Sequence, residues 1–145
     1  MRVLFLDFDG VLKRQNAFHW WEDCCSRLNR VIAATDCKIV VSSNWRHIYP
    51  TLPELSAILS VMGIPARAIF DRTPFADERR IEVRKWLEQH TSIIESYAII
   101  DDAFGLTCGM TRSRLVVTDP QYGMQTEHAD ELIRLLLTPA LRLGG

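Results

Sequence analysis

The sequence predicts an open, doubly wound α/β fold, in which a mostly parallel five-stranded sheet carries helices on both faces. Short apolar runs rich in β-branched residues alternate with helical patterns along the whole chain, and this alternation is typical of parallel sheets. The apolar runs are nearly continuous, as expected for strands that are covered on both faces. The 145 residues contain no repeat, low-complexity segment or linker, so we expect a single domain over residues 1–145.

The predicted elements follow one another in a regular order. The first apolar run, Val3–Phe8, meets acidic residues after only a few positions, which favours a buried strand over a secretory signal segment. The other predicted strands are Lys38–Val41, Ala68–Phe70, Tyr97–Ile100 and Arg114–Thr118. The predicted helices are Trp21–Ala34, Pro53–Met62, Asp77–His90 and Thr126–Leu137. The last of these has its leucines on one side and most of its charges on the other, which predicts a helix that docks on the rest of the domain.

The composition excludes several classes of protein. Hydrophobic residues make up 48% of the chain and charged residues 24%, close to the average of soluble globular proteins. A chain of this length buries roughly two-thirds of its unfolded surface, so it needs no disulfide or metal to fold. Seventeen basic and eighteen acidic residues give a formal charge of −1, which excludes a strongly basic nucleic-acid tail and an acidic disordered segment. No apolar run approaches the ~18 residues of a membrane helix, and we expect a cytoplasmic protein.

The cysteines do not form a metal or redox motif. There is no C-x-x-C pair and no zinc-like spacing with histidine. The four residues are Cys24, Cys25, Cys37 and Cys108. We expect the adjacent Cys24 and Cys25 to pack inside a helix.

Acidic residues follow the first predicted strand. In open parallel sheets, ligands bind beyond the carboxyl ends of the strands, so the residues at these ends are the candidates for function. Asp7 and Asp9 lie on the same side of the strand, with Phe8 turned the other way, and Gly10 can release the chain into a turn. Two nearby carboxylates repel each other unless a cation lies between them. The alternative is an acidic strand end that caps the following helix.

Two more strand ends carry polar residues. Ser42, Ser43 and Asn44 follow the second strand, and a hydroxyl beside exposed amides can hold phosphate oxygens; the alternative is a helix cap or a turn. Asp101 and Asp102 follow the fourth strand, and with Asp7 they offer the oxygen ligands that suit Mg²⁺, although an Asp pair can also simply form a turn. The three features at one edge of one sheet together favour a Mg²⁺-dependent phosphate site.

The polar strand ends resemble the ordered motifs of the haloacid dehalogenase (HAD) superfamily over nearly the whole chain. The matching stretches are Phe5–Val11, Val40–Asn44, a basic residue that opens a helix, and Ile99–Asp102. Three stretches also resemble the small HAD domains of bacterial Swiss Army Knife RNA repair proteins. They are Ser42–Arg46, Arg79–Leu87 and Thr118–Pro120.

The resemblance implies a phosphatase that works through an aspartyl-phosphate. Asp7 would be the nucleophile, and Asp9 would protonate the leaving oxygen and then activate water. The implied cofactor is Mg²⁺, held by Asp7, the backbone carbonyl of Asp9 and Asp101, with Asp102 behind it or bound through water. Ser42 would hold a phosphoryl oxygen, helped by nearby amides at Ser43 and Asn44.

The basic residue of the superfamily has three candidates here. Matching the stretch from Glu82 to Leu87 favours Arg79, while Arg80 and Lys85 remain alternatives. The gaps from Asp9 to Ser42 and from Ser42 to Arg79 are 33 and 37 positions, too short for a separate cap domain. An open site of this kind suits large substrates.

Basic and aromatic residues near the strand ends bear on the substrate. They are Lys13, Arg14, Arg46, His47, Arg72, Arg80, Phe18, Trp20, Trp45 and Tyr49. Charges that pair with phosphates and rings that stack on bases are typical of single-strand recognition, so phosphorylated RNA, DNA or nucleotide ends are the favoured substrate. Packed rings and solvated surface charges are the plainer interpretation. The other hypotheses are a phosphatase for a small phosphorylated metabolite or a phosphoprotein, and a partner-dependent binding or regulatory module that keeps the metal site without turnover.

Overall fold

The computed structural model describes residues 1–13, 19–102 and 109–140, and it confirms the predicted fold class. Five strands form one sheet in the order β3-β2-β1-β4-β5, and each neighbouring pair is parallel. The strands are β1 (Arg2–Leu6), β2 (Lys38–Val41), β3 (Ile69–Arg72), β4 (Ser96–Asp101) and β5 (Leu115–Val117). The helices are α1 (Glu22–Thr35), α2 (Leu52–Val61), α3 (Arg79–Gln89) and α4 (Thr126–Leu136).

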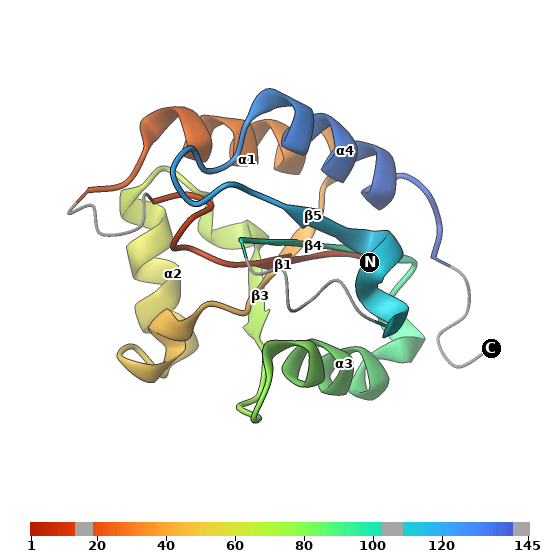
Figure 1. The fold of residues 1–145 in the computed structure, drawn as a ribbon. Coiled ribbons are helices and arrows are strands. Elements are labelled where there is room, and N and C mark those ends of the chain that lie inside the picture. The colour runs from red at the N-terminus through yellow and green to blue at the C-terminus, as the bar shows by residue number, and fades with distance from the viewer. Residues whose placement is uncertain (14–18, 103–108, 141–145) are drawn as a thin grey trace.

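The alternation of side chains along β1 divides the core into two layers. Leu4 and Leu6 belong to the larger cluster, to which α1, α2 and α4 contribute. Val3 and Phe5 point the opposite way and belong to a smaller cluster with α3. Figure 1 shows α1 and α4 side by side over one face of the sheet and α3 beneath the other. The strands are therefore covered on both faces, as their continuous apolar character predicts.

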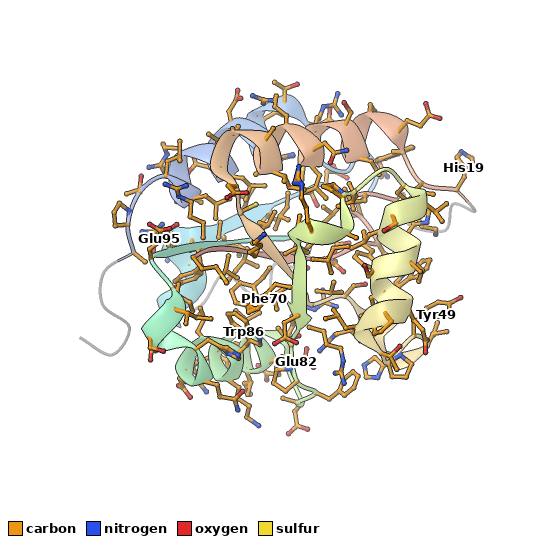
Figure 2. All side chains as sticks on the ribbon, turned by 180° about the vertical axis from the view of Figure 1, so that it is seen from behind. His19, Tyr49, Phe70, Glu82, Trp86 and Glu95 are labelled. Carbon is orange, nitrogen blue, oxygen red and sulfur yellow. The ribbon has the colours of Figure 1, made fainter. Side chains whose placement is uncertain are left out.

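Aromatic rings fix α3 against its face of the sheet. Trp86 of α3 is fully buried, and it makes edge-on contacts with Phe5 at a centroid distance of 5.5 Å and with Phe70 at 6.2 Å. The labelled Phe70 and Trp86 lie beside each other in Figure 2. The Trp86 indole also donates a hydrogen bond to Asp71 Oδ2 at 2.8 Å. These contacts set where α3, and the residues at its start, lie relative to the strand ends.

Most element boundaries differ from the predicted ones by one or two positions, and three of these differences have a local reason. β1 ends at Leu6 rather than Phe8, because the Phe8 carbonyl accepts hydrogen bonds from the N–H groups of residues 11, 12 and 13 and turns the chain. β3 begins at Ile69, since Ala68 ends a 3₁₀ turn. α3 begins at Arg79 rather than Asp77, because Glu78 is extended at φ −133° and ψ 146°.

The strand order places a switch point between β1 and β4. The chain builds outward from β1 through β2 to β3, and then returns to add β4 on the other side of β1. Leu6 pairs with Ile100 in β4 and with Val41 in β2, so the residues after these three strands meet at one edge. Ligands of open α/β sheets bind at this kind of position.

Cys24 and Cys25 are packing residues, as predicted, and so is Cys37. Cys24, Cys25 and Cys37 are buried and form no disulfide, and Cys108 lies outside the described residues. Burial raises the pKa of Cys24 and of Cys25 to about 11, so both remain neutral thiols near pH 7. No helix in the described part of the chain is long and apolar enough to cross a membrane.

Candidate active site

Three carboxylates meet where β1 and β4 end. Asp7, Asp101 and Asp102 each offer an oxygen, and these oxygens all lie within 4.8 Å of one another. Asp7 is held in place by two hydrogen bonds: its N–H donates to the Ile100 carbonyl at 3.2 Å, and its Oδ1 accepts from the Phe8 N–H at 2.9 Å. Asp101 is fully buried. The β1–β4 register thus brings together the acidic residues that the sequence predicted at separate strand ends.

Gly10 allows this close approach. Its φ is +79°, in the left-handed region, and a Cβ built at this position would lie 2.3 Å from Asp102 Oδ2. The turn is also tied to β5, because the Thr118 hydroxyl donates to the Gly10 carbonyl at 2.7 Å. A side chain at position 10 would therefore both strain the backbone and displace Asp102.

Arg79 is the basic residue that reaches the acidic group. Its Nη1 lies 2.7 Å from Asp101 Oδ2 and 3.2 Å from Asp7 Oδ2. Arg80, the second candidate, is half-exposed and pairs with Glu78 at 2.6 Å. Lys85, the third, is exposed further along α3. The structure therefore places one of the three predicted candidates in the site and two outside it.

The site holds more negative than positive charge. Burial raises the pKa of Asp7 well above its ordinary value and Asp101 raises it further, while Arg79 acts in the opposite direction. Burial and Asp101 also raise the pKa of Asp102. Burial lowers the pKa of Arg79, but Asp7 and Asp101 more than offset this, so Arg79 stays charged. A cation bound by these hard oxygen ligands would relieve the remaining repulsion, and the donor set fits Mg²⁺.

Ser42 presents a buried hydroxyl to this edge of the sheet. Its N–H donates to the Leu6 carbonyl at 3.0 Å, which fixes it beside the end of β1. Its Oγ is the one buried side-chain polar atom without a hydrogen-bond partner among the described residues. Such atoms are costly in folded proteins and point to a missing ligand or water. Ser43, in contrast, caps the 3₁₀ helix η1 (Asn44–His47), because its Oγ accepts from the Trp45 N–H at 3.2 Å.

Asp9 lies apart from the three clustered carboxylates. Its Oδ2 accepts a hydrogen bond from the Trp45 indole at 3.0 Å, and its Oδ1 lies 3.7 Å from the Lys13 ammonium. Its side chain therefore is not in the acidic group, which leaves only its backbone carbonyl for the metal role that the resemblance implies. Lys13 and Trp45, which the sequence predicts to contact substrate, both contact this carboxylate.

Arg46 corrects one prediction. We expected it to contact substrate, but its side chain is fully buried. It donates to Thr73 Oγ1 at 2.7 Å, to the Ser43 and Thr73 carbonyls at 2.8 Å, and to Glu82 Oε1 at 2.8 Å. Glu82 in turn accepts from the Ala76 N–H at 3.1 Å. Arg46 thus joins the segments after β2 and β3 to α3, and no local pattern predicts that a charged residue takes this buried position.

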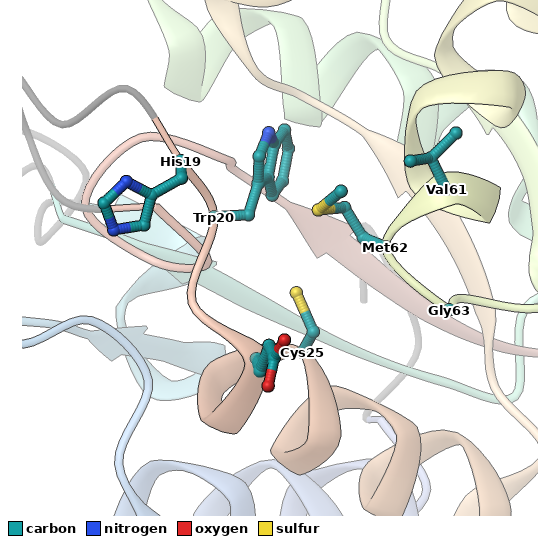
Figure 3. A pocket seen from close by; sticks show the side chains of 7 residues that line it. His19, Trp20, Cys25, Val61, Met62 and Gly63 are labelled. Carbon is teal, nitrogen blue, oxygen red and sulfur yellow. The ribbon is translucent and has the colours of Figure 1, made fainter.

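Two hollows open near these residues. One, of about 420 Å³, is lined by Asn44, His47, Arg79 and Asp102 among others, and it gives access to the acidic group. The other, of about 520 Å³, lies between the start of α1 and the end of α2. Figure 3 shows Trp20, Cys25 and Met62 around it. The second hollow has one lining thiol, Cys25, which stays neutral, and no acidic cluster. We therefore place the candidate active site in the first hollow.

The predicted aromatic residues that the structure describes pack against one another. Trp20, Trp45 and Phe8 pack together at centroid distances of 5.2 to 5.8 Å, and Tyr49 stacks on Trp45 at 5.9 Å. Arg14 and Phe18 lie outside the described residues. The rings near the strand ends therefore serve partly as a packed cluster behind Asp9.

The fold and the site together define a class of protein. A parallel five-stranded sheet, acidic residues at the ends of β1 and β4, a serine after β2 and an arginine at the start of α3 are the features of a HAD-like hydrolase, and the described residues show no cap domain.

Comparison with known proteins specifies the family. The family model described as the HAD domain in Swiss Army Knife RNA repair proteins matches residues 3–129, and the chain belongs to this family. No curated protein and no solved structure matches the chain. The match confirms the resemblance seen in the motifs.

Replacing Arg46 tests its structural role. Arg46→Met would leave Glu82 as a buried carboxylate without its partner, so we expect a loss of about 3–5 kcal/mol in the free energy of unfolding, measured by urea denaturation. The control is Arg84→Met, which removes an exposed residue 3.9 Å from Glu88 and should barely change the midpoint. A stable Arg46→Met protein that only binds substrate more weakly would contradict this role.

The buried charge of Asp7 predicts a pH dependence of stability in the metal-free protein. Because the pKa of Asp7 is raised above its unfolded value of 3.8, the unfolded chain releases this proton first, and stability falls as pH rises from about 4 through the folded pKa. We expect Asp7→Asn to flatten this fall and, in EDTA at pH 7, to raise Tm by roughly 4 °C, or about 1 kcal/mol. The exposed Asp130→Asn is the control. An Asp7→Asn protein that melts lower than wild type, with the same pH profile, would overturn this assignment.

Proposed function

We propose that this chain is a Mg²⁺-dependent phosphatase that hydrolyses phosphate monoesters through an aspartyl-phosphate on Asp7, and that it acts at phosphorylated nucleic-acid ends. One observation carries the proposal: three carboxylates within 4.8 Å of one another lie beside Arg79, at the sheet edge where Ser42, with its unpartnered hydroxyl, is bound to the end of β1. The carboxylates supply a nucleophile and cation ligands, while Arg79 and Ser42 supply donors for phosphate oxygens.

The first half of the reaction transfers the phosphoryl group to the protein. A carboxylate oxygen of Asp7 attacks phosphorus, and the bond from phosphorus to the ester oxygen breaks. Asp9 gives its proton to that leaving oxygen, so the alcohol departs neutral. Its hydrogen bond with Trp45 at 3.0 Å keeps this carboxyl near the site and away from the attacking group. Arg79 and Ser42 hold the oxygens of the transferring group.

The second half restores the enzyme. Water attacks the phosphorus of the aspartyl-phosphate, Asp9 takes a proton from that water, and the bond from phosphorus to the Asp7 oxygen breaks to release inorganic phosphate. Mg²⁺, held by Asp7 and Asp101 with Asp102 close by, would neutralise charge on the phosphate and on the nucleophile. The first half requires an ionised Asp7, which its raised pKa opposes until positive charge is bound beside it, and the second half releases Asp7 again as a carboxylate.

The family and the open pocket support a nucleic-acid end as substrate. The matching family is named for domains in RNA repair proteins. The hollow of about 420 Å³ has no cap over it among the described residues, so a long chain can leave the site through solvent. A phosphate at the end of an RNA or DNA strand is a monoester, which is the group that this chemistry hydrolyses.

Phosphate release tests the proposal directly. We expect release from RNA and DNA oligonucleotides with a 3′- or 5′-phosphate, and from an aryl phosphate, to require Mg²⁺ and to fall by at least about 10³-fold in Asp7→Asn. Asp130→Asn, which removes an exposed carboxylate on α4, should keep wild-type rates.

The outcomes separate the hypotheses. Bound Mg²⁺ without release from any ester would replace the enzyme with a binding module. Turnover of small esters alone would remove nucleic acid as the substrate. Full activity in Asp7→Asn would refute the aspartyl-phosphate.

Trp45→Phe tests how Asp9 is positioned. The change removes the indole donor but keeps a ring, so we expect kcat to fall about tenfold for alkyl phosphates, whose leaving oxygen needs a proton, and much less for 4-nitrophenyl phosphate. The control is Tyr122→Phe, a change at an exposed ring on the turn after β5 that makes no contact with Asp9. Equal losses for both esters would show that Trp45 acts only through packing.

A further inference from the structure

Two aromatic rings contact each other beside the active-site hollow. His47 ends η1, which follows β2, and Phe75 lies in the segment after β3. Their ring centroids are 4.6 Å apart with an interplanar angle of 30°. Because β2 and β3 are neighbours in the sheet, their following segments meet at the same edge, on the far side of β2 from the acidic group.

This ring pair is exposed, and two guanidinium groups lie against its Phe75 ring. Phe75 keeps 44% of its surface exposed. The guanidinium groups of Arg46 and Arg72 lie 4.9 and 5.5 Å from the centre of its ring, close enough for cation–π attraction. Arg46 is itself buried and fixed by its hydrogen bonds. The pair therefore has a firm support on the Phe75 side, and nothing in the core requires its exposure.

His47 is the ring of the pair that a ligand would meet. It is exposed and lines the hollow of about 420 Å³ together with Arg79 and Asp102. That volume is in the range of pockets that hold molecules larger than a phosphate. A phosphate near Arg79 would leave the rest of the substrate facing His47.

We propose that His47, supported by Phe75, stacks on the nucleobase of the nucleotide that carries the terminal phosphate. Every base offers a π-face, so such a ring accepts nucleic-acid ends without selecting their sequence. The inference rests on the proposed phosphatase function for the position of the phosphate, and it adds the residues that recognise the group attached to it. Phe75 acts here as a positioning residue, because it reaches the base only through His47.

The test compares pairs of oligonucleotides that differ only in the terminal base. Each pair carries a 3′- or 5′-phosphate on a terminal nucleotide that is either intact or abasic. We expect wild-type kcat/KM to be about tenfold higher with the base present, through KM. The same preference should appear in the affinity of Asp7→Asn for these oligonucleotides, measured by fluorescence anisotropy.

Substitutions at position 47 separate stacking from charge. His47→Phe keeps a ring and should retain the preference for the base, whereas His47→Lys supplies a positive charge without a ring and should lose it. Phe75→Leu should weaken the preference, because the support of His47 is reduced. The control is Tyr122→Leu, which should leave the preference for the base unchanged. It removes an exposed ring on the turn after β5, and β5 and β3 are at opposite edges of the sheet.

Each outcome decides the inference. A wild-type ratio near one, or a preference kept by His47→Lys and lost by His47→Phe, overturns it, and so does turnover of phosphopeptides with no dependence on a base. Base-dependent binding without phosphate release supports the stacking and refutes the phosphatase. Phosphate release without base dependence supports the phosphatase and refutes the stacking.

Discussion

The repulsion between carboxylates buried at one edge of the sheet is the constraint on which the rest of the site depends. Leu6 pairs with Ile100, so the next residues, Asp7 and Asp101, are brought side by side by backbone hydrogen bonding rather than by any attraction of their own. Arg79 offsets part of this repulsion from 2.7 and 3.2 Å. A bound cation would relieve the repulsion that Arg79 leaves. The free energy of this repulsion in the metal-free site would therefore contribute to cation affinity.

The position of Arg79 depends in turn on the buried ion pair between Arg46 and Glu82. Glu82 lies three residues after Arg79 on α3, and thus on the same side of the helix. Its carboxylate binds Arg46 at 2.8 Å and the Ala76 N–H at 3.1 Å. The start of α3 is therefore tied to the segments that follow β2 and β3. An arginine in the core and an arginine in the site play complementary roles, one fixing the frame in which the other acts.

The sequence predicts much of the fold and the centre of the site, because both follow from strand periodicity. Asp7, Ser42 and Asp101 directly follow apolar runs, and parallel strands place such residues at one edge. Arg46 could not be predicted in the same way, since its burial depends on Thr73 and Glu82, which come from two other elements. Local patterns report which residues end a strand, but not which of them turn back into the core.

Local sequence patterns also could not decide between Arg79 and Arg80 or predict the contacts of Asp9, because both depend on tertiary structure. Adjacent residues on a helix point about 100° apart, so a shift of one position decides which arginine faces the acidic group. The helix begins at Arg79 because Glu78 is extended, and that boundary depends on tertiary contacts of Glu82. The bond from Trp45 to Asp9 spans 36 positions of sequence and has no local signal at all.

The Trp45 indole gives this site an optical reporter of its own. Its N–H is bound to Asp9, its ring is stacked on Tyr49 and it lies 5.3 Å from the Trp20 ring. The fluorescence of an indole responds to the charge beside its N–H group. A proton or a cation that changes the charge at Asp9 should therefore change the fluorescence of Trp45. Occupancy of the site can therefore be followed in the unlabelled protein, in real time, without waiting for a product to accumulate.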